Sequence, residues 1–278
     1  MEYEITKDEI IVKNATTFNP KATLESGQMF RFECKNDIYS VFAGAEFAKI
    51  IQESPENYRI ITQNPKFFVN YFDFNTDYDI IQKELSKFDA VKPALQFAKG
   101  VRILKQDIFE TLVCFIISAN NNIKRIKKSV GLICENFGTK TSWGYAFPTP
   151  QQLKRATESD FVKFGLGYRA PYMVDTVAKI VSGWNLEEIK NLPTEKAREK
   201  LLTLKGVGPK VADCILLFGA GKKDVFPVDT WIEKVWHDQF NGQTTNRKQI
   251  AKELVNTFQD YSGICQQYMF YYKRELKI

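Results

Sequence analysis

Short stretches rich in Ile, Val, Phe and Tyr alternate with polar turn residues over about the first ninety positions of the chain. Such stretches, separated by Asn, Asp, Gly or Pro, are typical of β-strands. They predict strands over Ile10–Val12, Met29–Phe32, Tyr39–Phe42 and Tyr58–Ile61. Residues 1–98 are therefore expected to form an N-terminal domain built on a twisted antiparallel β-sheet.

The spacing of apolar residues changes after position 100. Ile108, Leu112, Phe115 and Ile116 recur at intervals of three and four residues, which is the spacing of a helix that buries one face. From there to the end the pattern predicts mainly helices, so residues 99–278 are expected to form a second, helical domain. The predicted fold class is α+β, mainly α.

The composition narrows the chemistry that the chain can perform. The 278 residues include one histidine, His237, so sites with several histidine ligands and most nucleophiles activated by histidine are hard to build. We expect any chemistry to depend on carboxylate, lysine or cysteine side chains. The net charge of 39 − 33 = +6 is a modest basic excess that fits a phosphate-bearing partner.

The cysteines and the N-terminus indicate the cellular compartment in which the protein is expected. The five cysteines are widely spaced and form no CxxC pair, which disfavours both a disulfide framework and a zinc site. They are Cys34, Cys114, Cys134, Cys214 and Cys265. The chain starts without the pattern of a signal peptide, and no apolar run approaches the ~20 residues of a membrane span. We expect a cytoplasmic protein with reduced thiols and no membrane partner.

The densest chemical signal is a glycine-rich connection between two predicted helices. An amphipathic helix over Glu195–Leu202 and an apolar helix over Val211–Phe218 flank Gly206 and Gly208. Glycine permits a tight turn and a close backbone approach to a ligand, and amides at a helix start can bind a phosphate oxygen. For this motif alone, an ordinary helix connection remains the alternative interpretation.

A second segment changes that interpretation. Asp229 follows Lys210 by nineteen residues, inside a Phe-Pro-Val-Asp-Thr-Trp stretch that predicts a loop entering a third helix. Hairpin, lysine and Pro-Val-Asp together resemble the helix-hairpin-helix glycosylase superfamily named for its Gly-Pro and trailing Asp, and specifically the 8-oxoguanine DNA glycosylases. The other segments that agree, in order, are Ser26-Gly27-Gln28 with Phe30-Arg31, Gln106-Asp107, Ser118 to Ile123 with Arg125, Gly165 to Ala170, Val211 to Cys214, and Gln266 with Phe270.

The resemblance implies a two-lobed all-α glycosylase domain after the β domain, and double-stranded DNA containing oxidised guanine as the partner of a monomer. In the family a lysine, here Lys210, attacks C1′ of the extruded nucleotide. An amine attacks only when it is uncharged, which desolvation favours. Asp229 matches the family's essential aspartate, whose carboxylate stabilises positive charge on the sugar as the base leaves. It is also expected to cap its helix.

The resemblance also assigns the base pocket. The family position of Gly27 accepts, through its carbonyl, a hydrogen bond from the N7 hydrogen that 8-oxoguanine has and guanine lacks. Gln266 and Phe270 lie four residues apart and share a helix face, where the family pair bonds the Watson–Crick edge and stacks on the base. Cys214 matches a cysteine whose thiol lies against the base. A turn glycine, a core aromatic and a small buried thiol are the plainer alternatives.

DNA contacts are implied at two further places. Asn120 matches the residue that fills the vacated stack, Arg125 and Arg169 those that contact the orphan cytosine, and Tyr168 a wedge at the neighbouring pair. Both arginines together predict a preference for 8-oxoguanine opposite cytosine, because their donors reach the cytosine acceptors. The hairpin residues expected to contact the DNA backbone are Gly206, Gly208 and Val211.

The chain departs from the family pattern two residues after the aspartate. Many members carry a phosphate-binding histidine there, whereas this chain has Trp231, and His237 lies further along the predicted helix. Sister enzymes with an iron–sulfur cluster end in four closely spaced cysteines, but this C-terminus has only Cys265, so no cluster and no other cofactor is expected. A structural monovalent cation at the hairpin remains open.

Two alternatives to an 8-oxoguanine glycosylase with lyase activity remain. One keeps the superfamily and changes the lesion, for example to an alkylated base or an oxidised pyrimidine. The other is a helix-hairpin-helix module that binds the duplex backbone without chemistry. That module would explain Gly206 and Gly208, but it gives no reason for Lys210 and Asp229 to occur together.

Overall fold

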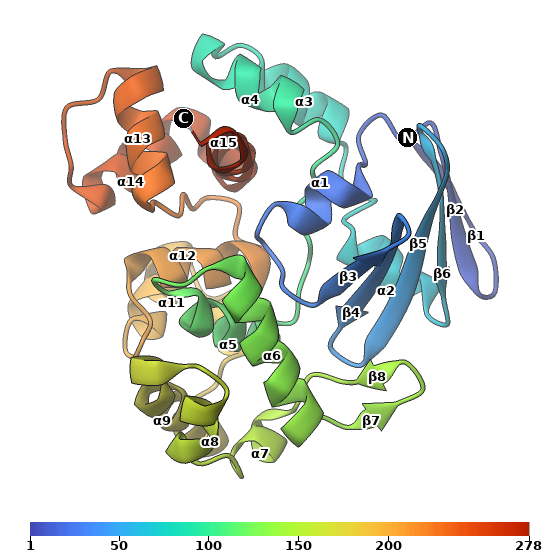
Figure 1. The fold of residues 1–278 in the computed structure, drawn as a ribbon. Helices are drawn as coiled ribbons and strands as arrows, with labels where there is room; N and C mark the ends of the chain where they lie inside the picture. Colours follow the sequence, from blue (N-terminus) through green and yellow to red (C-terminus); the bar gives the residue numbers. More distant parts are fainter. Residues whose placement is uncertain (278) are drawn as a thin grey trace. The chain divides into compact units, whose positions relative to one another are not determined.

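The computed structural model describes residues 1–277. Its contacts divide the chain into two compact units, each assembled from segments that are distant in sequence. Unit 1 holds residues 1–28, 50–105 and the segment from 221 onward, and unit 2 holds residues 29–49 and 106–220. Figure 1 draws the elements of both units. The sequence pattern divides the chain once, between residues 98 and 99, and this domain boundary stays a prediction.

A six-stranded sheet has the strand order β1-β2-β6-β5-β4-β3, and its strands are blue to cyan in Figure 1. The strands are β1 (Glu2–Ile5), β2 (Glu9–Lys13), β3 (Phe32–Lys35), β4 (Ile38–Ala43), β5 (Glu46–Ser54) and β6 (Asn57–Thr62). β2 pairs antiparallel with β1 and β6, and β3 pairs antiparallel with β4. The antiparallel sheet predicted from the sequence is confirmed.

The alternating pattern locates three of the predicted strands correctly. In β2, for example, Ile10 and Val12 are fully buried while their neighbours are partly or fully exposed, as expected when successive side chains point to opposite faces. The predicted strand Met29–Phe32 is wrong for its first three residues, because β3 begins at Phe32. Those three residues are buried without belonging to a strand, so the apolar character of Met29 and Phe30 reflects packing rather than strand pairing.

The described residues of unit 1 form seven α-helices, four of them in the segment that the sequence pattern assigned to strands. They are α1 (Pro20–Glu25), α2 (Pro65–Tyr71), α3 (Tyr78–Leu85), α4 (Lys92–Phe97), α13 (Thr230–Phe240), α14 (Arg247–Phe258) and α15 (Ser262–Leu276). The first three are short, and each starts at a capping side chain, Asn19, Asn64 or Asp77, that accepts backbone amides. Proline also occupies the first turn of α1 and α2, where its missing N–H costs nothing.

A buried arginine ties the loops of unit 1 together. Arg102 is 1% exposed, and its guanidinium donates to the carbonyl oxygens of Thr17, Phe72, Asp73 and Thr76 at 2.7–3.1 Å. Burial lowers the pKa of Arg102, and the carbonyl dipoles offset part of the cost of burying the charge. Arg102 therefore acts as a structural cation that holds several loops.

Unit 2 is mainly helical. Its helices are α5 (Ile108–Ser118), α6 (Ile123–Phe137), α7 (Pro150–Leu153), α8 (Glu158–Lys163), α9 (Ala170–Val181), α10 (Glu188–Asn191), α11 (Thr194–Leu201) and α12 (Pro209–Phe218). A two-stranded hairpin of β7 (Lys140–Thr141) and β8 (Gly144–Tyr145) follows α6. Within residues 1–277, no helix in either unit is both long and apolar enough to cross a bilayer.

Helix α5 is the buried centre of unit 2. The sequence predicts one buried face, but the structure buries every residue from Ile108 to Ile117, so that expectation is corrected. The reason is that α5 has neighbours on several sides, among them α6, α9 and α12. Against α12, the rings of Phe115 and Phe218 stack with centroids 5.5 Å apart. A Cβ at Gly219 would lie 3.1 Å from the backbone of Ile108, so glycine permits this close approach.

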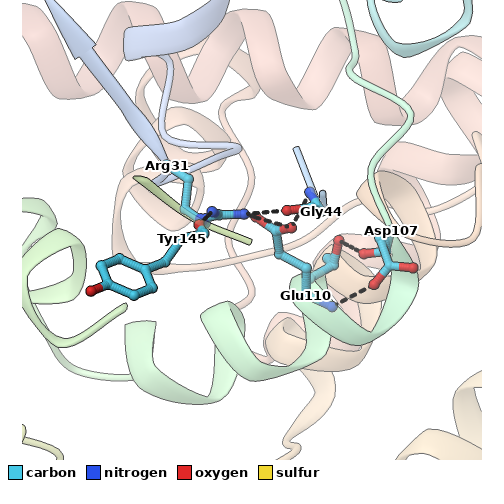
Figure 2. Close-up of polar contacts among 6 residues, drawn as sticks. Arg31, Gly44, Asp107, Glu110 and Tyr145 are labelled. Carbon is cyan, nitrogen blue, oxygen red and sulfur yellow. Dashed lines mark hydrogen bonds and ion pairs between the residues drawn. The ribbon is translucent and has the colours of Figure 1, made fainter. Parts of the chain in front are cut away.

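One buried ion pair connects three segments of unit 2 (Figure 2). Arg31 donates to Glu110 on α5 at 3.4 Å, to the carbonyl of Tyr145 in β8 at 2.7 Å and to the carbonyl of Gly44 at 3.1 Å. The amide of Gly44 donates back to Glu110 at 2.8 Å. Burial raises the pKa of Glu110, while Arg31 and the Gly44 amide oppose that shift by favouring the carboxylate.

Removing one member of this pair should destabilise the fold strongly. The two side chains are 7% and 10% exposed, and a buried charge left without its partner costs about 3–5 kcal/mol. We expect Glu110→Leu to lower the free energy of unfolding, measured by urea denaturation, by about that amount. The double variant Arg31→Met with Glu110→Leu should recover part of the loss. Equal stabilities of Glu110→Leu and the parent would contradict this role.

Candidate active site

The predicted glycine hairpin joins α11 to α12 in unit 2. Gly206 has φ +82°, a conformation that favours glycine, and a Cβ there would lie 3.0 Å from the ring of Tyr172 on α9. The same helix holds the hairpin from two more points: Thr176 Oγ1 donates to the carbonyl of Lys205 at 3.2 Å, and Lys205 Nζ pairs with Asp175 at 3.0 Å. The hairpin is therefore a fixed structure.

A second ion pair connects the two helices of the hairpin, α11 and α12. Arg198 Nε on α11 donates to Asp213 Oδ1 on α12 at 2.6 Å, and Asp213 is 5% exposed. Burial by itself would lower the pKa of Arg198, but Asp213 and Glu195 raise it above its ordinary value. The pair fixes the direction in which α12 leaves the hairpin.

Lys210 lies in the first turn of α12, directly after Pro209. Its side chain is half-buried, and its amine lies 5.2 Å from the centroid of the Phe115 ring on α5. Among residues 1–277, no carboxylate forms an ion pair with it. The first turn of α12 thus places this amine against an aromatic ring of α5.

The other predicted residues of α12 and the hairpin differ in exposure. Gly208 is exposed and precedes the helix, and a Cβ there would meet no atom within 4 Å. The side chains of Val211 and Cys214 are buried, at 6% and 3% exposure, with Cys214 one turn after Lys210. A direct contact of Val211 with DNA would therefore involve its backbone amide, and that contact stays a prediction.

The predicted stack-filling and wedge residues form one cluster. Arg169 donates to the carbonyls of Ala119 and Asn120 at 2.8 and 2.9 Å and to that of Leu166 at 3.2 Å. Asn120 is exposed with φ +49°, and Tyr168 is 55% exposed with its ring 4.3 Å from the Arg169 guanidinium. Because Arg169 is only 6% exposed, its visible function is to fix the loop that carries Asn120. Its contact with cytosine stays a prediction.

Arg125 lies in the first turn of α6, whose start is capped by Asn122. The cap oxygen accepts the Arg125 amide at 3.0 Å, while the Arg125 side chain is exposed together with those of Lys124 and Lys128. The helix thus presents several cations to solvent, and only Arg125 has a planar group able to form paired hydrogen bonds with a base.

In unit 1 the Gly27 turn is held on both sides. Gln28 is fully buried; its amide nitrogen donates to the carbonyls of Thr23 and Arg102 at 3.1 and 2.8 Å, and its oxygen accepts the Leu104 amide at 2.8 Å. On the other side, Gln267 of α15 donates to the carbonyl of Ser26 at 2.9 Å. Gly27 itself has φ +86°, so the turn places its peptide in a conformation that other residues rarely adopt.

Gln266 and Phe270 lie on one face of α15, as predicted. Gln266 is 4% exposed, and its Nε2 donates to the carbonyl of Pro227 at 3.2 Å. Its Oε1 is buried and has no hydrogen-bond partner in the described chain. An unpaired buried acceptor is unfavourable, and the contact of Gln266 with a base stays a prediction.

Asp229 is the N-cap of α13, as predicted. Its Oδ1 accepts the amides of Trp231 and Ile232 at 2.9 and 3.0 Å. The carboxylate therefore satisfies two of the amides that a helix start leaves without a partner. The second oxygen, Oδ2, takes no part in this cap, so capping and an electrostatic function are compatible.

Trp231 and His237 both make contacts within the chain, and a phosphate contact of either is not shown. Trp231 is half-buried, with Lys234 Nζ 5.0 Å from its ring, and His237 Nδ1 hydrogen bonds with the carbonyl of Gly242 at 2.7 Å. Residues 1–277 contain no group of three or more His, Cys, Asp or Glu arranged for a metal ion. At the hairpin, the carbonyl of Lys205 already accepts a bond from Thr176, and a monovalent cation there stays a prediction.

The predicted residues fall into one group in each unit. Unit 2 brings together the lysine, the hairpin and the Asn120 cluster, while unit 1 brings together the Gly27 turn, the α15 pair and Asp229. Sequence reasoning missed three residues that hold these groups: Gln267, Arg198 and Arg102. Gln267 directly follows a predicted residue, but no local pattern marks which backbone carbonyl such a side chain will reach.

Comparisons with known proteins identify the family of the chain. Residues 10–112 match the N-terminal domain of 8-oxoguanine DNA glycosylase, and residues 113–259 match the HhH-GPD superfamily of base excision DNA repair proteins. A solved structure of Clostridium acetobutylicum 8-oxoguanine glycosylase/lyase, in complex with double-stranded DNA containing cytosine opposite 8-oxoguanine, is 40% identical. It has a TM-score of 0.95 and covers 100% of this chain and 99% of that one.

Two further relatives are eukaryotic. N-glycosylase/DNA lyase of Saccharomyces cerevisiae is 39% identical over 56% of this chain and 46% of that protein, and N-glycosylase/DNA lyase OGG1 of Arabidopsis thaliana is 33% identical over 62% and 52%. The chain thus spans about half the length of these two relatives. It belongs to the HhH-GPD superfamily of base excision DNA repair proteins and, within it, to the family of 8-oxoguanine DNA glycosylases.

Substitutions at Asp229 should separate its cap from its charge. Asparagine caps a helix about as well as aspartate, whereas loss of the cap costs about 1 kcal/mol. We expect Asp229→Asn to keep the parent's free energy of unfolding and Asp229→Ala to lower it by about that amount. Both should lose at least about 100-fold in single-turnover base excision, because the carboxylate is gone. Full activity of Asp229→Asn would show that the charge is not needed.

Proposed function

We propose that this protein excises 8-oxoguanine from double-stranded DNA and then cleaves the strand at the abasic site. The observation that carries the proposal is the half-buried amine of Lys210, which lies against an aromatic ring beside a rigid glycine hairpin and forms no ion pair with a carboxylate among residues 1–277. The family relationship and the relatives, which are named as glycosylase and lyase proteins, support the same conclusion.

The chemistry starts with extrusion of the damaged nucleotide, because a base cannot be excised inside the stack. In our proposal the neutral amine of Lys210 attacks C1′. The bond between C1′ and the base breaks, and its electron pair leaves with the base, which takes up a proton. The carboxylate of Asp229 stabilises the positive charge that develops on the sugar. Loss of a proton from the nitrogen and opening of the sugar give a Schiff base.

The lyase step follows from the Schiff base. The protonated imine acidifies the hydrogen on C2′, and removal of that proton breaks the C3′–O bond with departure of the 3′ phosphate. The strand is thereby nicked by β-elimination, and hydrolysis of the imine restores Lys210. Every atom that this sequence requires comes from the DNA, the lysine and water.

Base recognition is assigned to the residues of unit 1. We assign to the Gly27 carbonyl the contact with the N7 hydrogen, to Gln266 the Watson–Crick edge and to Phe270 stacking on the ring. Two observations support this assignment: hydrogen bonds hold the turn at Gly27 on both sides, and Gln266 Oε1 has no partner in the described chain. From unit 2, Cys214 would contact the base. A hydrogen bond that discriminates by leaving a partner unsatisfied is worth about 1–3 kcal/mol.

DNA contacts are assigned to the exposed residues around the hairpin. Gly206, Gly208 and the Val211 amide would contact a phosphate, since helix starts and glycine turns bind anions. Tyr168 and Asn120 would enter the duplex, and Arg125 would contact the cytosine left unpaired. We further propose a monomer that acts in the cytoplasm; in the described chain none of the five cysteines forms a disulfide.

Borohydride trapping tests the nucleophile. Reduction of the Schiff base should link the parent covalently to an 8-oxoguanine duplex, and Lys210→Gln should abolish the covalent product because it has no amine. Lys196→Gln, at an exposed lysine of α11, is the matched control and should trap like the parent. Trapping of Lys210→Gln at the parent's level would remove Lys210 from the mechanism. A panel of other damaged bases in the same assay shows whether the lesion assignment holds.

Arg125 should determine the preference for the opposite base. A good arginine–base contact is worth about 1–3 kcal/mol of discrimination, so Arg125→Ala should lower the ratio of excision rates opposite cytosine and adenine by about tenfold or more. Lys128→Ala, which removes another exposed cation of α6, should leave the ratio unchanged. An unchanged ratio in Arg125→Ala would assign the preference elsewhere.

A further inference from the structure

Helix α15 carries three residues of the base-recognition group at intervals of four, and the sequence resemblance assigned only two of them. Gln266, Phe270 and Arg274 lie on one stripe of the helix. Along this stripe, the half-buried Phe270 stands between two residues that each carry a buried polar atom without a partner in the described chain. The first atom is the acceptor Oε1 of Gln266, and the second is the donor NH1 of Arg274.

The Arg274 guanidinium is fixed by its other nitrogens. Nε and NH2 donate to Glu275 Oε1 at 2.9 and 2.7 Å, and NH2 also donates to the carbonyl of Glu25 at 2.6 Å. The side chain is 14% exposed, and its guanidinium carbon lies 5.3 Å from the centroid of the Phe270 ring. These contacts hold the planar group in place and leave NH1 as its unused donor.

The unused donor lies beside the Gly27 turn. A Cβ built on Gly27 would lie 2.5 Å from Arg274 NH1 and 3.3 Å from Cε1 of Phe270. The space that a side chain at position 27 would need is thus occupied by a charged donor and the edge of the aromatic ring. The Gly27 peptide, the Phe270 ring and NH1 therefore adjoin one another.

We propose that Arg274 is a specificity-determining residue that donates a hydrogen bond to a carbonyl oxygen of the extruded base, beside N7. The inference rests on the proposed function. In 8-oxoguanine the oxygens on C6 and C8 flank the N7 hydrogen, and both are acceptors. A base stacked on Phe270 can meet the acceptor of Gln266 at one edge and the donor of Arg274 at the other. The two unpaired atoms are complementary in kind to what those edges offer.

Binding measurements separate this function from a contact with the DNA backbone. The probe is a duplex whose 8-oxoguanine nucleotide carries a 2′-fluoro sugar that resists excision, and the comparison is a tetrahydrofuran duplex that lacks the base. Arg274→Met should weaken binding of the first at least about tenfold and binding of the second less than twofold. Arg59→Met, at a partly exposed arginine of β6 that pairs with Glu9, is the control and should change neither.

Two further comparisons make the test decisive. Arg274→Gln keeps a short polar donor and should retain more of the 8-oxoguanine affinity than Arg274→Met; it also serves if Arg274→Met fails to melt cooperatively. A 2′-fluoro 8-oxoadenine duplex keeps the oxygen on C8 and replaces the oxygen on C6 by an amino group. If Arg274→Met weakens binding of both bases, the acceptor is on C8; if it weakens only 8-oxoguanine binding, the acceptor is on C6.

The outcomes that overturn the inference are distinct from failure of the proposed function. Equal losses on the 8-oxoguanine and tetrahydrofuran duplexes would assign Arg274 to the DNA backbone, and no loss on either would remove it from recognition. In both cases the parent still prefers 8-oxoguanine. A parent that binds 8-oxoguanine and undamaged duplexes equally would instead contradict the proposed function itself.

Discussion

The packing of α12 on the buried helix α5 is the interaction on which the proposed chemistry depends. It fixes the first turn of α12, and with it the amine of Lys210, against the face of Phe115. Lysine is a poor nucleophile while protonated, so the environment of this amine matters more than its presence in the sequence. The hairpin, tied to α9, and the Arg198–Asp213 pair keep the turn from moving away.

Recognition in unit 1 follows a second constraint, which is that buried polar groups are normally paired. Around the Gly27 turn, Gln28 and Gln267 pair with the backbone of Thr23, Ser26, Arg102 and Leu104. Two side-chain atoms on α15 have no partner in the described chain, and they belong to the residues four before and four after Phe270. Exceptions of this kind usually have a reason in function, and a base with a donor at one edge and an acceptor at the other supplies one. Unit 1 thus combines a turn held by hydrogen bonds with two polar atoms on α15 that a bound base could pair with.

The sequence predicted the parts of the fold that depend on local pattern. Alternation gave the strands that contain Ile10, Tyr39 and Tyr58, and the glycine hairpin, the following helix and the Asp229 cap were found at their observed positions. It missed the short helices α1 to α4, because each is only six to eight residues long and too short for a clear periodicity. It also underestimated how much of α5 is buried, because that burial depends on helices that follow α5 much later in the chain.

The candidate residues came from motif resemblance, but their environments required coordinates. Nothing local in the sequence shows that Arg169 is buried against carbonyl oxygens, that Gln267 supports the Gly27 turn, or that one nitrogen of Arg274 has no partner. Each of these facts joins residues tens to hundreds of positions apart. Pairing across such distances is a property of the packed chain, so a short motif cannot encode it by itself.

The central claim is that the amine at position 210 forms the covalent bond with the sugar. Peptide mass mapping of the borohydride-reduced complex tests it directly. Trypsin does not cleave after a modified lysine, so the account predicts the sugar adduct on the uncleaved peptide that spans residues 206–222, with Lys210 as the modified residue. An adduct on the N-terminal amine or on any other lysine would contradict the account.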